Sequence, residues 1–382
     1  MIARRAQEIE PFLAVEVFER AQALEQQGHE VIHLEFGEPD FETPLVIREA
    51  AARAIAEGRT RYTASLGILP LREAIAEHYQ KHYRVEISPD QILITTGTSP
   101  AMLLLFLTLL NPGDEVVLSD PHYACYPNFI KHAEGVPVYV PTEETDGFQL
   151  HPEAVRERLT PRTQALLLNS PANPTGMVLA PNRMASLAEL PTWIISDEIY
   201  HGLTYEGEEH TILEYTDRAF VLNGFSKAYA MTGWRLGYLI APKEFIPTLR
   251  RLHMNFFISC NDFVQWAGVA ALREAGPDVV RMRGIFDERR RAMVAGLRAL
   301  GLGVAREPTG AFYVLANAWR FTEKSYDFAF ELLDGAHVAV TPGIDFGAQA
   351  EGYLRFSYAN ALEKIRVALT RLGTFFKETG RL

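Results

Sequence analysis

The sequence contains very little cysteine. Cys125 and Cys260 are its only cysteines, and their separation fits neither a disulfide framework nor a metal-binding knuckle. We therefore expect two reduced thiols, as in a cytoplasmic protein, and no metal site. The opening stretch, MIARRAQEIEPF, has glutamates where a secretory signal would have its apolar region, so we expect no such signal.

Long stretches of one chemical character are also missing. No run of lysine and arginine supplies a basic stripe, and the net charge of −11 at pH 7 argues against a nucleic-acid-binding surface. The longest apolar run, at 101–110, is about half as long as a membrane-crossing helix, so it predicts a buried helix. Small molecules are therefore the expected ligands, and neither nucleic acid nor a membrane is an expected partner.

Internal repeats, low-complexity tracts and flexible linkers are absent from the sequence as well. Between about residues 90 and 240, short apolar runs alternate with helical stretches, which predicts an α/β fold with a mostly parallel sheet covered by helices on both faces. After residue 276 the pattern indicates a smaller α+β unit. We predict a large domain over residues 41–276 and a small domain made of residues 1–40 and 277–382.

Polar residues gather where five of the predicted strands end. The strand interiors are rich in isoleucine, leucine and valine, whereas the carboxyl ends read TTGTSP, SDPHYACYP, NSPANPTG, SDEIY and NGFSK. In sheets of this type, ligands bind at the carboxyl ends of the strands. One rim of the sheet is therefore the predicted binding site.

Lys227 differs from the other six lysines, because it lies among glycine, serine and aromatic residues in GFSKAYAMTGWRLGY. A lysine kept from water is more readily the free amine that attacks an aldehyde, although a lone lysine is more often a surface side chain. Asp197 ends a strand, either as a cap or as the partner of a cation such as a pyridinium nitrogen. Thr98 and Ser99 open a helix where an anion can bind, and Arg235 could hold the same phosphate.

Five motifs together resemble a known enzyme family. FGEPDFETP, SPANPTG, SDEIY, SKAYAMTGWRLGY and LRFSYAN occur in the order and approximate spacing of the class I/II pyridoxal-phosphate-dependent aminotransferases, the aspartate aminotransferase-like enzymes of fold type I. The resemblance extends over about residues 35–360. It implies an α/β/α large domain with a mixed, mostly parallel sheet, a smaller α+β domain, and pyridoxal 5'-phosphate as the cofactor.

The resemblance also implies a role for each matching residue. Lys227 would hold the cofactor as the internal aldimine and then move the substrate proton. Asp197 would pair with the pyridine nitrogen, while Tyr200 and Asn173 would bind the ring oxygen. The further implied contacts are Tyr123 stacked on the ring, Thr98, Ser99 and Arg235 at the phosphate, Arg355, Asn173 and the Gly37 backbone at the substrate carboxylate, and Tyr62 at the phosphate of the other subunit in a homodimer with shared active sites.

The sequence departs from the family pattern at two positions. Many relatives have a phosphate-binding serine three residues before the lysine, where this chain has Gly224, and the nearby Ser226 could replace that serine. Relatives that act on acidic amino acids can have a lysine directly after the phosphate-binding turn, where this chain has Ser99. Aspartate is therefore a less expected substrate, and the sequence does not specify another one.

The predicted reaction is the transfer of an amino group between an L-amino acid and a 2-oxo acid in two half reactions. Lys227 would take the α-proton while Arg355 orients the carboxylate. One alternative is a C–S β-lyase or synthase that uses the same cofactor and fold. A second alternative is a non-enzymatic regulator that binds an effector, although residues 1–35 are too short and too acidic for the DNA-binding domain that such regulators usually carry.

Overall fold

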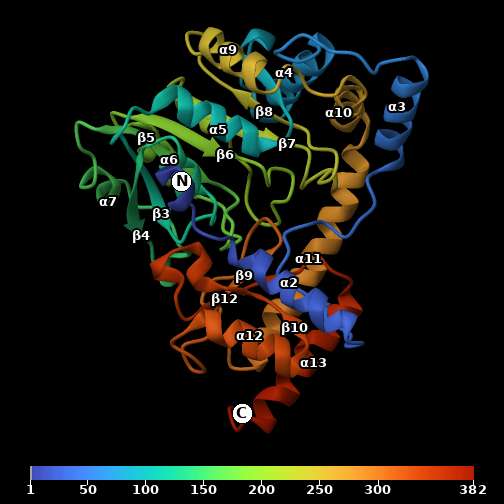
Figure 1. Cartoon of the computed structure of the whole chain (residues 1–382), viewed down its shortest axis with the longest axis vertical. Coiled ribbons are helices and arrows are strands. Elements are labelled where there is room, and N and C mark those ends of the chain that lie inside the picture. The colour runs from blue at the N-terminus through green and yellow to red at the C-terminus, as the bar shows by residue number, and fades with distance from the viewer. Residues whose placement is uncertain (1) are drawn as a thin grey trace.

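A mixed seven-stranded sheet forms the centre of the larger part of the molecule (Figure 1). The computed structural model describes residues 2–382. The four strand pairs from β7 to β4 are parallel, whereas β8 is antiparallel to both of its neighbours, which confirms the mostly parallel, mixed sheet. In spatial order the strands are β2 (Ile92–Thr95), β8 (Gly237–Ile240), β7 (Ala219–Gly224), β6 (Trp193–Asp197), β5 (Thr163–Asn169), β3 (Glu115–Asp120) and β4 (Val136–Pro141).

Helices cover both faces of this sheet. Successive side chains of a strand point to opposite faces, so in β5 Leu166 and Leu168 pack in one core and Ala165 and Leu167 in the other. The first face carries α3 (Leu45–Ala56), α4 (Leu69–Tyr83), α7 (Pro152–Arg156), α8 (Pro181–Ala188) and α10 (Asp262–Glu274). The second face carries α5 (Thr98–Leu109), α6 (Tyr126–His132) and α9 (Ile246–Phe256). The apolar run at 101–110 lies mostly in α5, where it supplies part of the core as predicted.

A smaller antiparallel sheet forms the core of the lower part of Figure 1. Its strands, in spatial order, are β11 (Thr341–Pro342), β12 (Tyr353–Ser357) and β9 (Tyr313–Asn317). Apolar side chains of three helices pack with it, from α11 (Gly276–Ala299), α12 (Ser325–Ala336) and α13 (Leu362–Glu378). The 24-residue helix α11 runs from the upper part of the molecule to the lower part (Figure 1). The predicted division at residues 40/41 and 276/277 stays a prediction.

The N-terminal segment contacts both parts of the molecule. After α1 (Arg4–Gln7), the backbone N–H of Glu10 donates to Asn128 Oδ1 in α6 over 3.0 Å. At the start of α2 (Leu13–Gln26), the N–H groups of Leu13 and Ala14 donate to Asp345 at 3.0 and 3.3 Å. Strand β1 (Ile32–His33) then pairs in parallel with β10 (Val338–Ala339). The other elements of residues 2–382 are five short 3₁₀ helices, at Pro89–Gln91, Glu144–Asp146, Ile212–Glu214, Gly343–Phe346 and Ala348–Ala350.

Residues 2–382 were compared with the requirements of a membrane-spanning helix, a metal site and a disulfide bond. None of the helices there is both long and apolar enough to cross a membrane. Over the same residues, no group of three or more histidine, cysteine, aspartate or glutamate side chains is arranged to hold a metal ion. Cys125 and Cys260 are both free thiols.

One ion pair fixes the segment that leads from β1 to α3. Arg289 on α11 donates to both carboxylate oxygens of Asp40, at 2.6 and 2.9 Å, and its own side chain is 8% exposed. Removing one partner of such a pair leaves a charge without its counter-ion, which is strongly destabilising. The position of residues 34–44, which pass beside the site described below, therefore depends on this contact.

We expect Asp40→Ala to lower the free energy of unfolding by about 3 kcal/mol, because Arg289 would remain as a buried and unpaired cation. Urea denaturation of both proteins measures the difference. Glu42→Ala is the matched control, because its pair with Arg48 is exposed and should be worth less than about 1 kcal/mol. Equal losses in the two variants would contradict the assigned importance of the Asp40 contact.

Candidate active site

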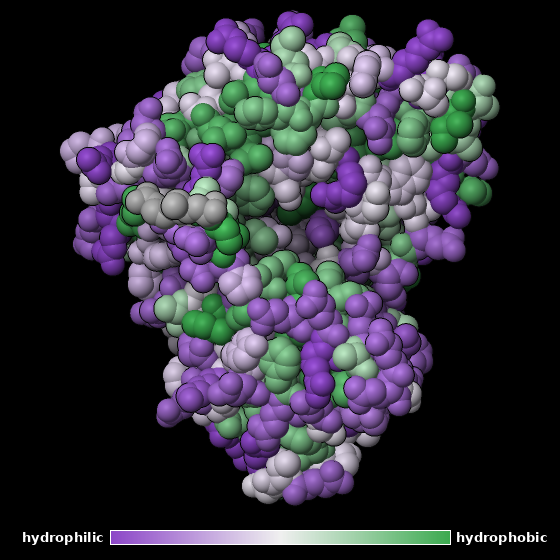
Figure 2. Space-filling model, viewed as in Figure 1, coloured by the Kyte–Doolittle hydropathy of each residue, from purple (hydrophilic) through white to green (hydrophobic). Residues whose placement is uncertain are grey.

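The polar strand ends meet around a cavity of about 240 Å³ between the two sheets. Figure 2 shows the surface hollowed between the upper and lower parts of the molecule. All but one of the predicted site residues line this cavity, namely Gly37, Thr98, Ser99, Tyr123, Asn173, Asp197, Tyr200, Ser226, Lys227, Arg235 and Arg355. The exception is Tyr62, which does not line it and is 82% exposed.

Lys227 follows the carboxyl end of β7 and its side chain lies inside the cavity. Its Nζ donates to the backbone oxygen of Gly37 over 2.7 Å, which fixes the amine on the side of the N-terminal segment. Burial lowers the pKa of Lys227 to about 8, and the positive charges of Arg355 and Arg235 act in the same direction. At neutral pH a larger fraction of this lysine is therefore the free amine than in an ordinary lysine.

Asp197 ends β6 at the floor of the cavity and is only 4% exposed. Its carboxylate accepts a hydrogen bond from the Tyr126 hydroxyl at 2.7 Å and one from the backbone N–H of Ile199 at 3.2 Å. Burial raises the pKa of Asp197 to about 6 despite these two bonds. Within residues 2–382, no cationic side chain forms an ion pair with it. The carboxylate is thus placed to receive a cation from a ligand.

An anion cradle lies at the amino end of α5. The turn before the helix needs glycine, since Gly97 has φ of +90° and a Cβ there would lie 2.6 Å from Nη2 of Arg235. Arg235 is held by a bond from its Nη1 to the backbone oxygen of Thr232 at 2.9 Å, so its charge lies against the first turn of the helix. Thr98 and Ser99 supply hydroxyls there, and helix N-termini favour anions.

Gly224 has a structural reason to be glycine in this chain. It lies on β7 opposite Gly237 of β8, and a Cβ at Gly224 would be 2.9 Å from the backbone oxygen of Leu236. Any side chain at this position would push the two strands apart. The serine that many relatives have there would not fit this backbone, whereas Ser226 lines the cavity beside Lys227.

Arg355 on β12 is a buried guanidinium, 2% exposed, that lines the cavity. Its Nη1 donates to Asn173 Oδ1 at 2.9 Å, and its Nη2 donates to Thr341 Oγ1 at 3.0 Å and to the backbone oxygen of Glu35. The Tyr313 ring lies 4.5 Å from the guanidinium carbon. Its Nε has no partner in the described part of the chain. This cation has neutral acceptors only, so it is suited to bind a carboxylate.

Sequence reasoning missed Tyr313, which connects several of these groups. Its hydroxyl lies 2.8 Å from the Tyr200 hydroxyl, and its ring packs against the guanidinium of Arg355. A Cβ at Gly37 would lie 1.9 Å from the Tyr313 oxygen, so glycine is required there for the segment to pass. These contacts of Tyr313 become visible only in the structure, where β9 lies close to the larger sheet.

Sequence reasoning also passed over Tyr126, although it stands in the same strand-end motif as Tyr123. Tyr123 lies beside the cavity and packs edge-on against Tyr126, with ring centroids 5.2 Å apart. A tyrosine three residues after a predicted ring-stacking tyrosine was a usable signal, because both follow the end of β3. Tyr126 was not identified because nothing in the sequence pairs it with Asp197.

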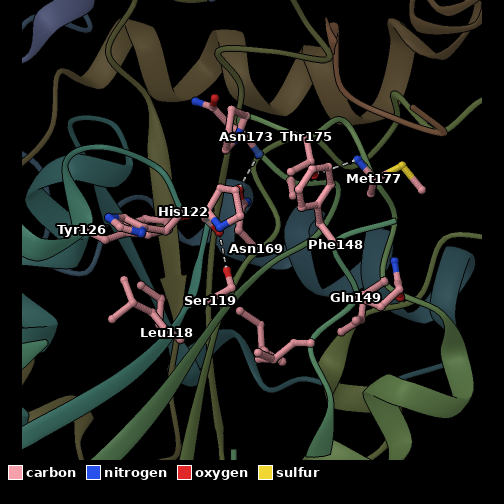
Figure 3. Close-up of a pocket in the computed structure, with 17 residues that line it drawn as sticks. Leu118, Ser119, His122, Tyr126, Phe148, Gln149, Asn169, Asn173, Thr175 and Met177 are labelled. Carbon is pink, nitrogen blue, oxygen red and sulfur yellow. Dashed lines mark hydrogen bonds between the residues drawn. The ribbon is translucent and has the colours of Figure 1, made fainter. Parts of the chain in front are cut away.

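A second, smaller pocket of about 50 Å³ adjoins the cavity (Figure 3). It shares Tyr126, Asn169 and Asn173 with the cavity, and the backbone N–H of Asn173 donates to Asn169 Oδ1 at 2.8 Å. This volume has room for a few water molecules only. The pocket is therefore too small to hold a substrate.

Comparison with known proteins identifies the family of the chain. Residues 29–372 match the family described as aminotransferase class I and II. The chain belongs to this family. Relatives include the aspartate/prephenate aminotransferase of Thermus thermophilus, 41% identical over 97% of each chain, and the (5-formylfuran-3-yl)methyl phosphate transaminase of Methanocaldococcus jannaschii, 39% identical over 99% of this chain and 100% of the relative.

Solved structures give the same result. The aspartate aminotransferase from Thermus thermophilus with maleate superposes with a TM-score of 0.94 and 40% identity, covering 98% of this chain and 99% of that chain. The protein is therefore an enzyme with the aspartate aminotransferase fold and transaminase activity, and its family uses pyridoxal phosphate. Aminotransferases of this family use amino acid and keto acid substrates.

The residues present fit pyridoxal phosphate in this aminotransferase. The cradle at Gly97 and Arg235 suits the phosphate, and Asp197 suits a protonated pyridine nitrogen. Lys227 offers an amine of lowered pKa to the aldehyde. Three separate features, an anion cradle, a carboxylate without a cation and a desolvated amine, thus match three different groups of one molecule.

Asp197→Asn should stabilise the cofactor-free aminotransferase at about pH 8 by roughly 2 kcal/mol. The pKa of Asp197 is higher in the folded than in the unfolded chain, so the folded state binds its proton more tightly. The stability that the protonated Asp197 contributes is therefore lost as the pH rises from about 4 to about 6. The asparagine variant does not titrate, so it does not lose this stability.

Urea denaturation of the cofactor-free proteins at about pH 4 and about pH 8 measures this effect. The exposed Asp217→Asn is the control, which should change the stability by less than about 0.5 kcal/mol. If Asp197→Asn is no more stable than the wild type at the higher pH, the prediction is wrong, because the Asp197 carboxylate would then have sufficient partners in the cofactor-free protein.

Proposed function

We propose that this aminotransferase uses Lys227 as the proton carrier and Arg355 as the carboxylate ligand in amino transfer from a 2-amino acid to a 2-oxo acid. The observation that carries the proposal is that one cavity holds the Lys227 amine, the Asp197 carboxylate and the Arg355 guanidinium. The chemistry supplied by a bound cofactor is the withdrawal of electrons from the substrate α-carbon. The protein must then bind, orient and move a proton.

Lys227 is suited to hold and release a proton at Nζ. Its pKa of about 8 lies close to neutral pH, where a general base is most effective. The Gly37 carbonyl accepts from Nζ at 2.7 Å and keeps the amine on one side of the cavity. A substrate whose α C–H bond faces this side would deliver its proton to Lys227.

Arg355 is suited to orient the substrate. Its guanidinium group is held by hydrogen bonds to Asn173, Thr341 and the Glu35 carbonyl, so the side chain loses little conformational freedom when a carboxylate binds. A carboxylate gripped in this way holds the α-carbon at one position relative to Lys227, which is the contribution of positioning to catalysis. Asn173 contacts Arg355 directly and would also border the substrate.

At the cofactor ring, the proposed roles belong to Asp197 and Tyr200. An ionised Asp197 would keep the pyridine nitrogen protonated, with Tyr126 holding the carboxylate in position. The Tyr200 hydroxyl can donate to the ring oxygen while it accepts from Tyr313, at 2.8 Å. Tyr123 would stack on the ring, and Thr98, Ser99, Ser226 and Arg235 would bind the phosphate.

We propose that amino transfer dominates over elimination in this transaminase, because both relatives named above are transaminases. A C–S β-lyase or synthase would use the same ring chemistry. An assay of amino transfer to 2-oxo acids, run beside an assay for released pyruvate and ammonia, separates the two outcomes. Dominant pyruvate and ammonia release would overturn the proposal of transamination.

We further propose a cytoplasmic homodimer with shared active sites. Tyr62 supports the shared site, because it is a tyrosine that is 82% exposed on a single chain and matches the family residue that reaches the phosphate of the other subunit. A large exposed aromatic side chain is common where protein surfaces meet. The two reduced cysteines support the cytoplasmic location.

Lys227→Ala should abolish amino transfer, with kcat lowered about a thousandfold or more, because no other lysine lines the cavity. The variant should also lack the visible absorption band of lysine-bound pyridoxal phosphate. Lys243→Ala is the matched control, since Lys243 is exposed and lies outside the cavity. A Lys227→Ala protein that keeps the band or the activity would refute the role given to this lysine.

Tyr62→Ala should raise the Kd for pyridoxal phosphate about tenfold, through the loss of one hydrogen bond to the phosphate. Sedimentation measures whether the Tyr62→Ala protein is a dimer. Mixed dimers of Tyr62→Ala and Lys227→Ala chains should regain one normal site, which pairs the lysine of one chain with the tyrosine of the other. The mixed dimers are made by unfolding the two variants together and letting them reassemble. If the mixture regains no tight site for pyridoxal phosphate, the shared-site proposal is wrong.

A further inference from the structure

Asn169 is a residue of the cavity that the proposed roles do not use. It ends β5, and the register of the sheet places it directly beside Asp197, the last residue of β6. It lines the same cavity as Lys227. Its side-chain amide can donate through Nδ2 and accept through Oδ1, so what it does depends on the groups that these two atoms contact.

Both ends of the Asn169 amide are hydrogen-bonded to residues with proposed roles in the site. Its Nδ2 donates to the backbone oxygen of Asp197 at 2.9 Å. Its Oδ1 accepts from the backbone N–H of Asn173 at 2.8 Å, a bond that is drawn in Figure 3. Because a carbonyl only accepts and an N–H only donates, a side chain that makes both bonds needs a donor and an acceptor on one group. Asn169 thus connects the end of β6 with the loop that follows β5.

The backbone bonds of this loop fix its shape more than its place. The N–H of Gly176 donates to the oxygen of Ala172 at 2.8 Å, which closes the loop on itself. The N–H of Ser170 donates to the oxygen of the last residue of β6 at 3.2 Å, which joins the two strand ends before the loop begins. The Asn169 side chain extends this connection to Asn173 itself. The distance from β6 to Asn173 is therefore set by this amide.

The side chain of Asn173 is held from the other direction. Asn173 is 5% exposed, and its Oδ1 accepts from Nη1 of Arg355 at 2.9 Å. Since Oδ1 has this partner, Nδ2 is the atom that can donate to the ring oxygen of the cofactor, which is the contact that the family resemblance implies for Asn173. A continuous row of hydrogen bonds therefore leads from Asp197 through Asn169 and Asn173 to Arg355.

We propose that Asn169 is a positioning residue, which holds Asp197 and Asn173 at the separation that lets both contact one pyridoxal ring. The inference rests on the proposed function, in which these two residues bind different polar atoms of the ring. A rigid ring forms both contacts at once only if the protein groups already have the matching separation, so the loss of the connecting amide weakens binding.

The test is a double-mutant cycle that measures the Kd for pyridoxal phosphate. Asn169→Leu keeps the size of the side chain and removes its donor and acceptor, and we expect it to raise the Kd about tenfold. Asn173→Ala removes the ring contact itself and should also raise the Kd about tenfold. Together the two changes should raise the Kd about twentyfold and not about a hundredfold, because the connecting amide matters less once the contact that it places is gone.

Gln149→Leu is the matched control. Gln149 is also an amide that bridges two backbone groups, since its Oε1 accepts from the N–H of Ala180 at 2.9 Å and its Nε2 donates to the oxygen of Val178 at 3.1 Å. It does not line the cavity of Lys227. Urea denaturation should show similar losses of stability in both leucine variants, whereas the Kd should rise only in Asn169→Leu. Asn169→Ala replaces the leucine variant in the cycle if that variant does not fold.

The possible outcomes lead to different conclusions. An unchanged Kd in Asn169→Leu, or a Kd in the double variant that equals the product of the two single effects, overturns the inference, because Asn169 would then act independently of Asn173. An equal rise in Gln149→Leu overturns it too, because the effect would then follow a general loss of stability. If the wild type shows no amino transfer, the proposed function fails, while the Kd values, which need no turnover, still decide the role of Asn169.

Discussion

The buried guanidinium of Arg355 holds together segments that are far apart in the sequence. Its hydrogen bonds reach Asn173, which follows the larger sheet, Thr341 in the smaller sheet, and the backbone oxygen of Glu35 in the N-terminal segment. The cavity exists only where these three segments meet. Because a buried cation must be solvated by the protein, the placement of its acceptors also fixes the walls of the site. The positioning of a substrate carboxylate is thus built into the packing of the two sheets.

Two ionisable groups of the cavity, Asp197 and Lys227, are poorly satisfied by the protein alone. Burial raises the pKa of Asp197 and lowers that of Lys227, so the charged form of each is disfavoured. Such sites lower the stability of the empty protein, and a ligand with complementary groups regains that energy as binding affinity. The same physical feature therefore accounts for perturbed pKa values and for ligand recognition.

The sequence was sufficient to predict which side chains the parallel strands bring to the cavity. Lys227 and Asp197 follow strand ends, and because those ends share one edge of a sheet, their proximity could be predicted. The antiparallel direction of β8 could not be predicted, because its four buried residues, Gly237–Ile240, do not indicate in which direction a strand runs. Tyr313 was missed because its contact with Tyr200 joins residues 113 positions apart in different sheets. Tertiary contacts of this kind leave no local pattern.

The lining of the cavity comes from two kinds of segment, the packed sheet with its helices and the N-terminal segment. The proposed proton carrier and cofactor ligands stand on the sheet or at the start of α5, where dense packing on both faces holds them rigidly. Phe12, Ala14 and Glu35 belong instead to the N-terminal segment, whose helix α2 is capped by the carboxylate of Asp345. Residues in such a connecting segment can change without disturbing either core. Relatives with one fold can therefore share one reaction and still differ in the amino acid on which they act.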